Sequence, residues 1–92
     1  MNITDGQKLA LIKLCQKFVK GRDGRLWILS QLLNKEVNST SELSINDWRK
    51  IRDMAYPHWP DNDWTISDEF MSIGNNLRLR YEKEVLGQMA LF

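Results

Sequence analysis

The chain has 92 residues and a net charge of +1, with 42% hydrophobic and 27% charged residues. This size and composition predict one small globular domain with a stability margin of a few kcal/mol. No apolar run approaches the roughly 18 residues of a membrane span. The opening MNITDGQK lacks the basic, apolar and small-residue regions of a signal peptide. The single cysteine cannot form an internal disulfide. We therefore expect a cytoplasmic protein that does not bind membranes.

Charge is distributed unevenly along the chain. Residues 1–36 carry seven basic and three acidic side chains, whereas residues 37–70 carry three basic and seven acidic side chains. A basic first third can attract phosphate groups. It can equally be the solvated side of one helix, which the acidic middle of the chain complements.

Two amphipathic helices are predicted in the first third. The segment from Thr4 to Gln7 fits a capping box. Apolar residues then recur at steps of three and four: Leu11, Leu14, Cys15, Phe18 and Val19. Gly21 is expected to end this helix, and Asp23 to cap a second helix with the apolar residues Leu26, Ile28, Leu29, Leu32 and Leu33. The position of Cys15 predicts a buried structural thiol and not a nucleophile.

A third helix is predicted to begin after Ser44 and to end before Pro57, which cannot continue it. Leu43 and Trp48 are spaced for a hydrophobic staple. The inward stripe comprises Trp48, Ile51 and Ala55. Val37 is expected to anchor the polar connection before this helix. The following YPHWPDNDW is expected to be a rigid loop whose aromatic rings cover the ends of the helices.

A fourth helix is predicted to begin after Thr65 or Ser67. Its inward residues keep helical spacing: Ile66, Phe70, Ile73, Leu77 and Tyr81. Gly74 is expected to kink or split this helix, and Gly87 to end it. The patterns together predict an all-α domain of about four helices over residues 1–87, followed by a flexible peptide at residues 88–92.

Few residues suit catalysis. His58 is the only histidine, so a Cys–His or Ser–His–Asp arrangement has no spare partner, and we interpret it as a loop residue. The acidic segment DNDWTISDE lacks the glycine and glutamate that a calcium loop requires at its sixth and twelfth positions. We expect a protein that is not an enzyme and that uses no cofactor or metal.

A basic ridge is predicted to run from the first helix into the turn after it. Its residues are Lys13, Lys17, Lys20, Arg22 and Arg25. Trp27 lies off the leucine stripe of the second helix, where it can stack on a nucleic-acid base or pack at the edge of the core. One function predicted by this pattern is DNA binding, as a small recombination-accessory protein. Four tryptophans in so small a chain are compatible with a monomer or a homodimer.

The last five residues, QMALF, resemble the peptide by which bacterial replication and repair proteins dock on the DNA polymerase sliding clamp. That peptide has a glutamine, an aliphatic residue, a small or acidic residue, and then Leu-Phe. The resemblance implies that Leu91 and Phe92 fill an apolar pocket, that Met89 occupies a neighbouring groove, and that Gln88 fixes the register. Ala90 departs from the commoner serine or aspartate. The alternative is a segment that folds back on the helices, with Phe92 in the core.

Residues 3–55 are similar to a small helical domain of phage-encoded DNA-metabolism proteins, including the Mu-type regulatory protein GemA. The shared features are an Ile-Thr-x-x-Gln opening, a leucine-rich second helix and a Ser-x-x-Leu-Ser/Thr connection, in which this chain has Thr40 in place of the first serine. Residues 56–86 fall outside this similarity. The two resemblances imply a non-enzymatic phage or bacterial protein of DNA replication or recombination. It would bind the clamp and either recruit a factor or compete with other clamp clients. A helical protein-interaction module is the further alternative.

Overall fold

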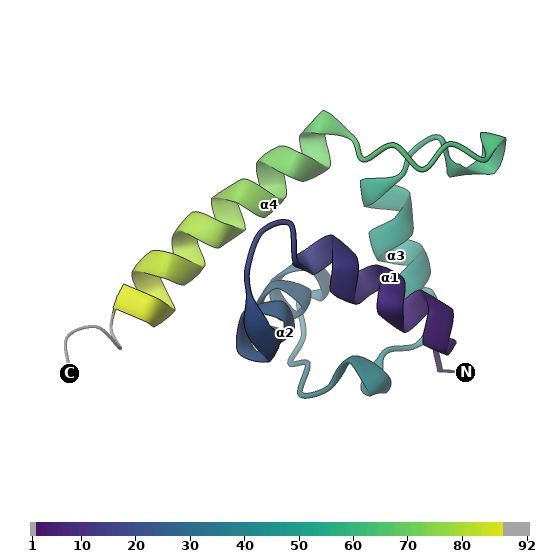
Figure 1. The fold of residues 1–92 in the computed structure, drawn as a ribbon. Helices are drawn as coiled ribbons and strands as arrows, with labels where there is room; N and C mark the ends of the chain where they lie inside the picture. Colours follow the sequence, from purple (N-terminus) through teal and green to yellow (C-terminus); the bar gives the residue numbers. More distant parts are fainter. Residues whose placement is uncertain (1, 88–92) are drawn as a thin grey trace.

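The computed structural model describes residues 2–87, and within this range it confirms the predicted all-α class. The described part has four α-helices: α1 (Asp5–Cys15), α2 (Gly21–Leu33), α3 (Ile45–Ala55) and α4 (Asp68–Tyr81). Two short 3₁₀ helices, η1 (Thr40–Glu42) and η2 (Trp59–Asp61), lie in the connections, and a π-helical turn, η3 (Glu82–Leu86), comes after α4. In Figure 1, α1, α2 and α3 lie together and α4 runs obliquely past them. None of these described helices combines the length and the apolarity that crossing a bilayer requires.

The starts of α1 and α3 are those that the sequence predicts. The Thr4 hydroxyl accepts a hydrogen bond from the Gln7 backbone N–H, and the Gln7 side chain accepts one from the Thr4 N–H. The same capping box occurs at α3. There the Ser44 hydroxyl accepts a hydrogen bond from the Asp47 N–H at 3.1 Å, and the Asp47 carboxylate accepts one from the Ser44 N–H at 2.9 Å. Each cap stabilises the fold by about 1 kcal/mol. Local sequence therefore sets where these two helices begin.

The predicted boundary between the first two helices is wrong. Gly21 does not end the first helix but is the first residue of α2, where its φ of 81° lies in the left-handed region that glycine favours. Asp23 lies inside the first turn of α2, and no side chain caps this helix at Lys20. The physical reason is that Phe18 and Val19, both buried, turn into the core, so the chain leaves the axis of α1 before Gly21.

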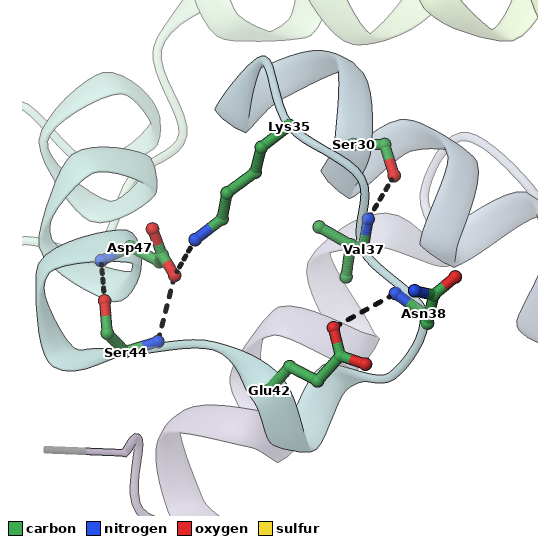
Figure 2. Close-up of polar contacts among 7 residues, drawn as sticks. All are labelled: Ser30, Lys35, Val37, Asn38, Glu42, Ser44 and Asp47. Carbon is green, nitrogen blue, oxygen red and sulfur yellow. Dashed lines mark hydrogen bonds and ion pairs between the residues drawn. The ribbon is translucent and has the colours of Figure 1, made fainter.

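The connection between α2 and α3 is held by polar contacts (Figure 2). The Ser30 hydroxyl accepts a hydrogen bond from the Val37 N–H at 3.1 Å, and the Val37 side chain is buried, as predicted. The Lys35 ammonium lies 2.7 Å from the carboxylate of Asp47, the residue that also caps α3. These contacts tie the connection to the helices on both sides of it.

One cluster of buried hydrophobic side chains draws on all four α-helices of the described chain. It includes the predicted inward residues of α3: Trp48, Ile51 and Ala55. Leu43, the other member of the predicted staple, is 1% exposed. Ile73 is an exception, because 38% of it is exposed, and its assignment to the inward stripe of α4 is wrong.

Gly74 neither kinks nor splits α4, which is continuous from Asp68 to Tyr81. The Phe18 ring lies directly against the Gly74 backbone, so close that a Cβ atom there would overlap the ring. The same ring meets Phe70 edge-on, with 6.0 Å between centroids. Gly74 therefore serves close packing, and a residue far away in the sequence imposes that requirement.

The two alternatives for the start of α4 are resolved, and its end differs from the prediction. The Ser67 hydroxyl, and not that of Thr65, accepts the hydrogen bond from the Phe70 N–H at 3.1 Å. At the other end the helix widens into η3, and Gly87 keeps right-handed dihedrals, φ −60° and ψ −41°. Gly87 therefore does not form a left-handed cap on this helix.

The aromatic loop between α3 and α4 matches its prediction in part. Trp59 lies against the last turn of α3, with the Arg52 guanidinium 3.7 Å from the ring centroid and its indole N–H donating to Asp53. Trp64 meets Tyr56 edge-on, but half of it remains exposed. One ring thus covers a helix end, whereas the other lies on the surface.

Candidate functional site

The predicted clamp-binding residues, Gln88, Met89, Leu91 and Phe92, lie outside the described residues. The structure does define where the segment they form is attached. Through η3 the chain continues the direction of α4 as far as Gly87. Figure 1 shows that this end of α4 is remote from α3 and from the loop that contains η2.

A cavity of about 450 Å³ lies between the α1–α2 turn and the C-terminal half of α4. Three of its lining residues carry positive charge: Lys17 and Lys20 come from the turn, and Arg78 comes from α4. The other lining residues are Gln16, Phe18, Val19, Tyr81, Glu82 and Leu86. We call this site the cationic cavity. It combines positive charge with an apolar surface, so it can hold an anion that also has an apolar part.

The fold of the α1–α2 turn explains why the lysines reach the cavity. The backbone N–H groups of Phe18 and Val19 both donate to the carbonyl of Cys15, closing a tight turn at the end of α1. Because Phe18 and Val19 point into the core, Lys17 and Lys20 on either side of them are exposed. The turn therefore presents two cations around a buried apolar pair.

The α4 wall is fixed by contacts of Tyr81. Its ring packs against Trp27 of α2, with 5.4 Å between centroids. It also approaches Gly24, where an added Cβ would lie 3.6 Å from the ring and 2.9 Å from the Val19 Cβ. These contacts hold Arg78, one helical turn before Tyr81, on the cavity side of α4.

The three cations of the cationic cavity form no ion pair within residues 2–87. The ion pairs of this part of the chain involve Lys8, Lys35, Arg52 and Arg80, and none includes a cation of the cavity. Glu82 is the one acidic side chain among the lining residues. The cavity wall thus carries three positive charges and one negative charge, and positive potential accumulates in it.

The N-terminus of α2 follows directly after Lys20, and its first turn contains the acidic Asp23. The other three α-helices are capped by the hydroxyls of Thr4, Ser44 and Ser67, whereas α2 has no side-chain cap at Lys20. The first backbone N–H groups of a helix carry partial positive charge and are unsatisfied unless a cap or a ligand accepts from them. Lys20 therefore stands at a helix N-terminus that has no side-chain cap.

The other residues of the predicted basic ridge take different positions. Lys13 is exposed in the last turn of α1. Arg22 donates to the backbone carbonyl of Asn38 at 2.9 Å, which ties it to the α2–α3 connection. Arg25 is half-buried, and its Nε has no hydrogen-bond partner among the described residues. Of the five predicted cations, Lys17 and Lys20 are the two that line the cavity.

Trp27 lies at the edge of the core, one of the two positions that the sequence leaves open for it. It is half-buried, with Tyr81 on its ring and the Arg80 guanidinium 5.5 Å from the ring centroid. A nucleic-acid base that stacked on the Trp27 ring would have to share it with Arg80 and Tyr81.

Cys15 is buried, as predicted for a structural thiol. Burial raises the pKa of this thiol to about 12, although the nearby charge of Arg25 acts in the opposite direction. The thiol is therefore protonated at neutral pH, and a protonated thiol is a weak nucleophile.

Arg78 is the residue that sequence analysis missed. Its position one turn before Tyr81 marks it as a neighbour of the inward stripe of α4. That spacing could have placed it beside the core, but not opposite Lys17 and Lys20, because the packing of α4 on the α1–α2 turn depends on Phe18 and Gly74.

Comparison with known proteins gives no match to a protein-family model, to a curated protein or to a solved structure.

Proposed function

We propose that this protein is a non-enzymatic accessory factor of phage or bacterial DNA replication or recombination, which acts in the cytoplasm by binding the DNA polymerase sliding clamp. The binding element is the segment Gln88–Phe92. The observation that carries the proposal is its sequence, QMALF, in which a glutamine, an aliphatic residue and a Leu-Phe pair stand at the spacing of clamp-binding peptides. The similarity of residues 3–55 to phage DNA-metabolism domains agrees with it.

The fold of the described residues supports a role for this segment outside the core. Residues 2–87 bury a cluster of large side chains drawn from all four α-helices, with Phe70, Leu11 and Leu29 no more than 1% exposed. The described residues therefore supply a hydrophobic core from all four α-helices. The last described residue, Gly87, comes after a helix that leads away from α3 (Figure 1).

A leucine-phenylalanine pair suits such a role energetically. A few buried anchors dominate the free energy of most protein interfaces. Two anchors on a short peptide are expected to give a dissociation constant on the order of 1 μM, because ordering the peptide costs part of the interaction free energy. At that affinity the protein can either bring a factor to the clamp or compete with other clamp clients.

The test is a titration of purified bacterial sliding clamp with three forms of the protein. The intact chain is expected to bind on the order of 1 μM. The double variant Leu91→Ala/Phe92→Ala is expected to lose at least tenfold in affinity with an unchanged melting temperature. The matched control is Leu79→Ala, which truncates a leucine that is 55% exposed on α4 and should leave the affinity unchanged.

Two outcomes contradict the proposal. The first is a clamp that does not bind the intact chain at 100 μM or below. The second is a large fall in the melting temperature of Leu91→Ala/Phe92→Ala, which would favour the alternative in which the segment packs on its own core as part of a helical interaction module.

A further inference from the structure

We infer that the cationic cavity binds the phosphodiester backbone of a single-stranded nucleic acid. The inference does not depend on clamp binding, because it rests on residues 16–20 and on the α4 and η3 residues that line the cavity, Arg78, Tyr81, Glu82 and Leu86. It differs from the ridge predicted by sequence, because it adds Arg78 and leaves out Arg22, Arg25 and Trp27.

The first step is the charge of the site. Lys17, Lys20 and Arg78 come from two separate segments and face one cavity with Glu82 as the lining acid. Like charges at close range repel one another, which costs stability unless an anion binds between them. Packing of Phe18 on Gly74 and of Tyr81 on Trp27 holds the two segments together in spite of that repulsion.

The second step is the chemistry of the ligand. Phosphate is recognised by lysine and arginine side chains, and the cavity presents two lysines and one arginine. The apolar part of the wall includes Val19 and Leu86, of which Leu86 is 42% exposed. A nucleotide unit offers a phosphate for the cations and a sugar or base for the apolar wall, which a simple inorganic anion does not.

The third step is the shape of the ligand. A cavity of about 450 Å³ is in the size range of small-ligand sites, so it admits a unit or two of a flexible strand. A duplex holds its phosphates on a stiff convex surface that does not enter a cavity of this kind. Lys13 extends the positive charge along α1, four residues before Lys17, and offers a contact to a neighbouring phosphate.

The experiment measures the fluorescence anisotropy of labelled 15-mer oligothymidylate at 50 mM and higher salt. The wild-type chain is compared with the triple variant Lys17→Gln/Lys20→Gln/Arg78→Gln. The matched control, Arg49→Gln/Lys50→Gln/Lys83→Gln, removes three exposed cations that do not line the cavity. We expect the cavity variant to bind at least tenfold more weakly at 50 mM salt and the control to change less than threefold.

The dependence on salt gives a second readout. Each phosphate contact to a single strand contributes about 0.7 to the slope of log affinity against log salt. Loss of three cations should therefore lower the slope by about 2 in the cavity variant. In the wild-type protein, adding the oligonucleotide should shift the backbone amide resonances of residues 16–22 and 78–82, a result that needs no variant to fold.

Four results would overturn the inference. They are no binding of the oligonucleotide at 50 mM salt, equal weakening by the control variant, amide shifts that map elsewhere, and equal or tighter binding of a 15-bp duplex. Competition by thymidine monophosphate at the same concentration as the 15-mer would indicate a small-molecule site and would overturn it as well. The chain truncated after Gly87 should keep its oligonucleotide affinity, which separates this test from that of clamp binding.

Discussion

The α2–α3 connection and the attachment of α4 hold neighbouring parts of the molecule in different ways. In the first, Lys35, Asp47 and Ser44 form a chain of polar contacts with distances of 2.7 to 3.1 Å (Figure 2). In the second, Phe18 packs on Gly74 and Tyr81 packs beside Gly24, so the contact is one of shape.

The two regions also differ in whether their charged side chains form ion pairs. In the α2–α3 connection, the charges of Lys35 and Asp47 satisfy each other and stabilise the fold. At the attachment of α4, apolar contacts hold the helix, and the cations at the rim of the cavity form no ion pair within the described residues. We conclude that charge has a structural role in the first region and is available to a ligand in the second.

The largest expected effect is at the attachment of α4. Gly74→Ala gains helix propensity, but its Cβ would overlap the Phe18 ring. Overpacking of this kind costs about 1–3 kcal/mol, and we expect a net loss near the upper end, seen as a lower midpoint in urea unfolding.

The control for this prediction is Gly6→Ala in α1. A Cβ there would meet only the Thr4 hydroxyl, at 4.0 Å. This substitution should be neutral or stabilising by up to about 1 kcal/mol. If Gly74→Ala behaved in the same way, the tight contact of α4 with Phe18 would be contradicted.

A smaller effect, and one that depends on pH, is expected in the α2–α3 connection. Partial burial by itself would raise the pKa of the Asp47 carboxyl, but hydrogen bonds from Lys35 and Ser44 outweigh it and lower the pKa below its ordinary value of 3.8. Because the folded state then has the lower pKa, the carboxylate stabilises the fold above pH 3.8, and this stabilisation is lost as the pH falls through the folded pKa.

Asp47→Asn is therefore expected to cost about 1 kcal/mol at pH 7, and the difference from wild type should shrink as the pH falls below 3.8. Urea unfolding at pH 7 and at a pH well below 3.8 measures both quantities. Asp61→Asn, in the exposed loop, is the control and should change stability little. A penalty for Asp47→Asn that is the same at both pH values would show that charge is not what Asp47 contributes.

The same contrast explains how far sequence could predict this molecule. The caps at Thr4 and Ser44 were predicted correctly because every group involved lies within four residues. Gly21 and Gly74 were misinterpreted because glycine suits a helix end, a helix start and a close contact equally well. The packing of Phe18 determines which role each glycine has. Its burial ends α1 before Gly21, and its ring lies so close to α4 that residue 74 has no room for a side chain. The cationic cavity depends on the same long-range contact, so only its two lysines were predicted.

The smallest expected effect concerns Glu82. It distinguishes most directly between charge that stabilises the fold and charge that is available to a ligand. Glu82→Gln removes the negative charge from the wall of the cationic cavity, so the 15-mer oligothymidylate should bind about threefold more tightly at 50 mM salt. This corresponds to roughly 0.7 kcal/mol for unit charges about 6 Å apart in water.

The gain should disappear as salt screens the site, and the melting temperature should stay the same. Glu84→Gln makes the same change of net charge on a residue that pairs with Arg80 and does not line the cavity, so its effect should be smaller. Asp47→Asn should show the reverse pattern, with lower stability and unchanged oligonucleotide affinity. If Glu82→Gln and Glu84→Gln improved oligonucleotide binding equally, the net charge of the protein and not the cavity would govern the affinity. Only binding at a local site can distinguish two glutamates that lie on one helical turn.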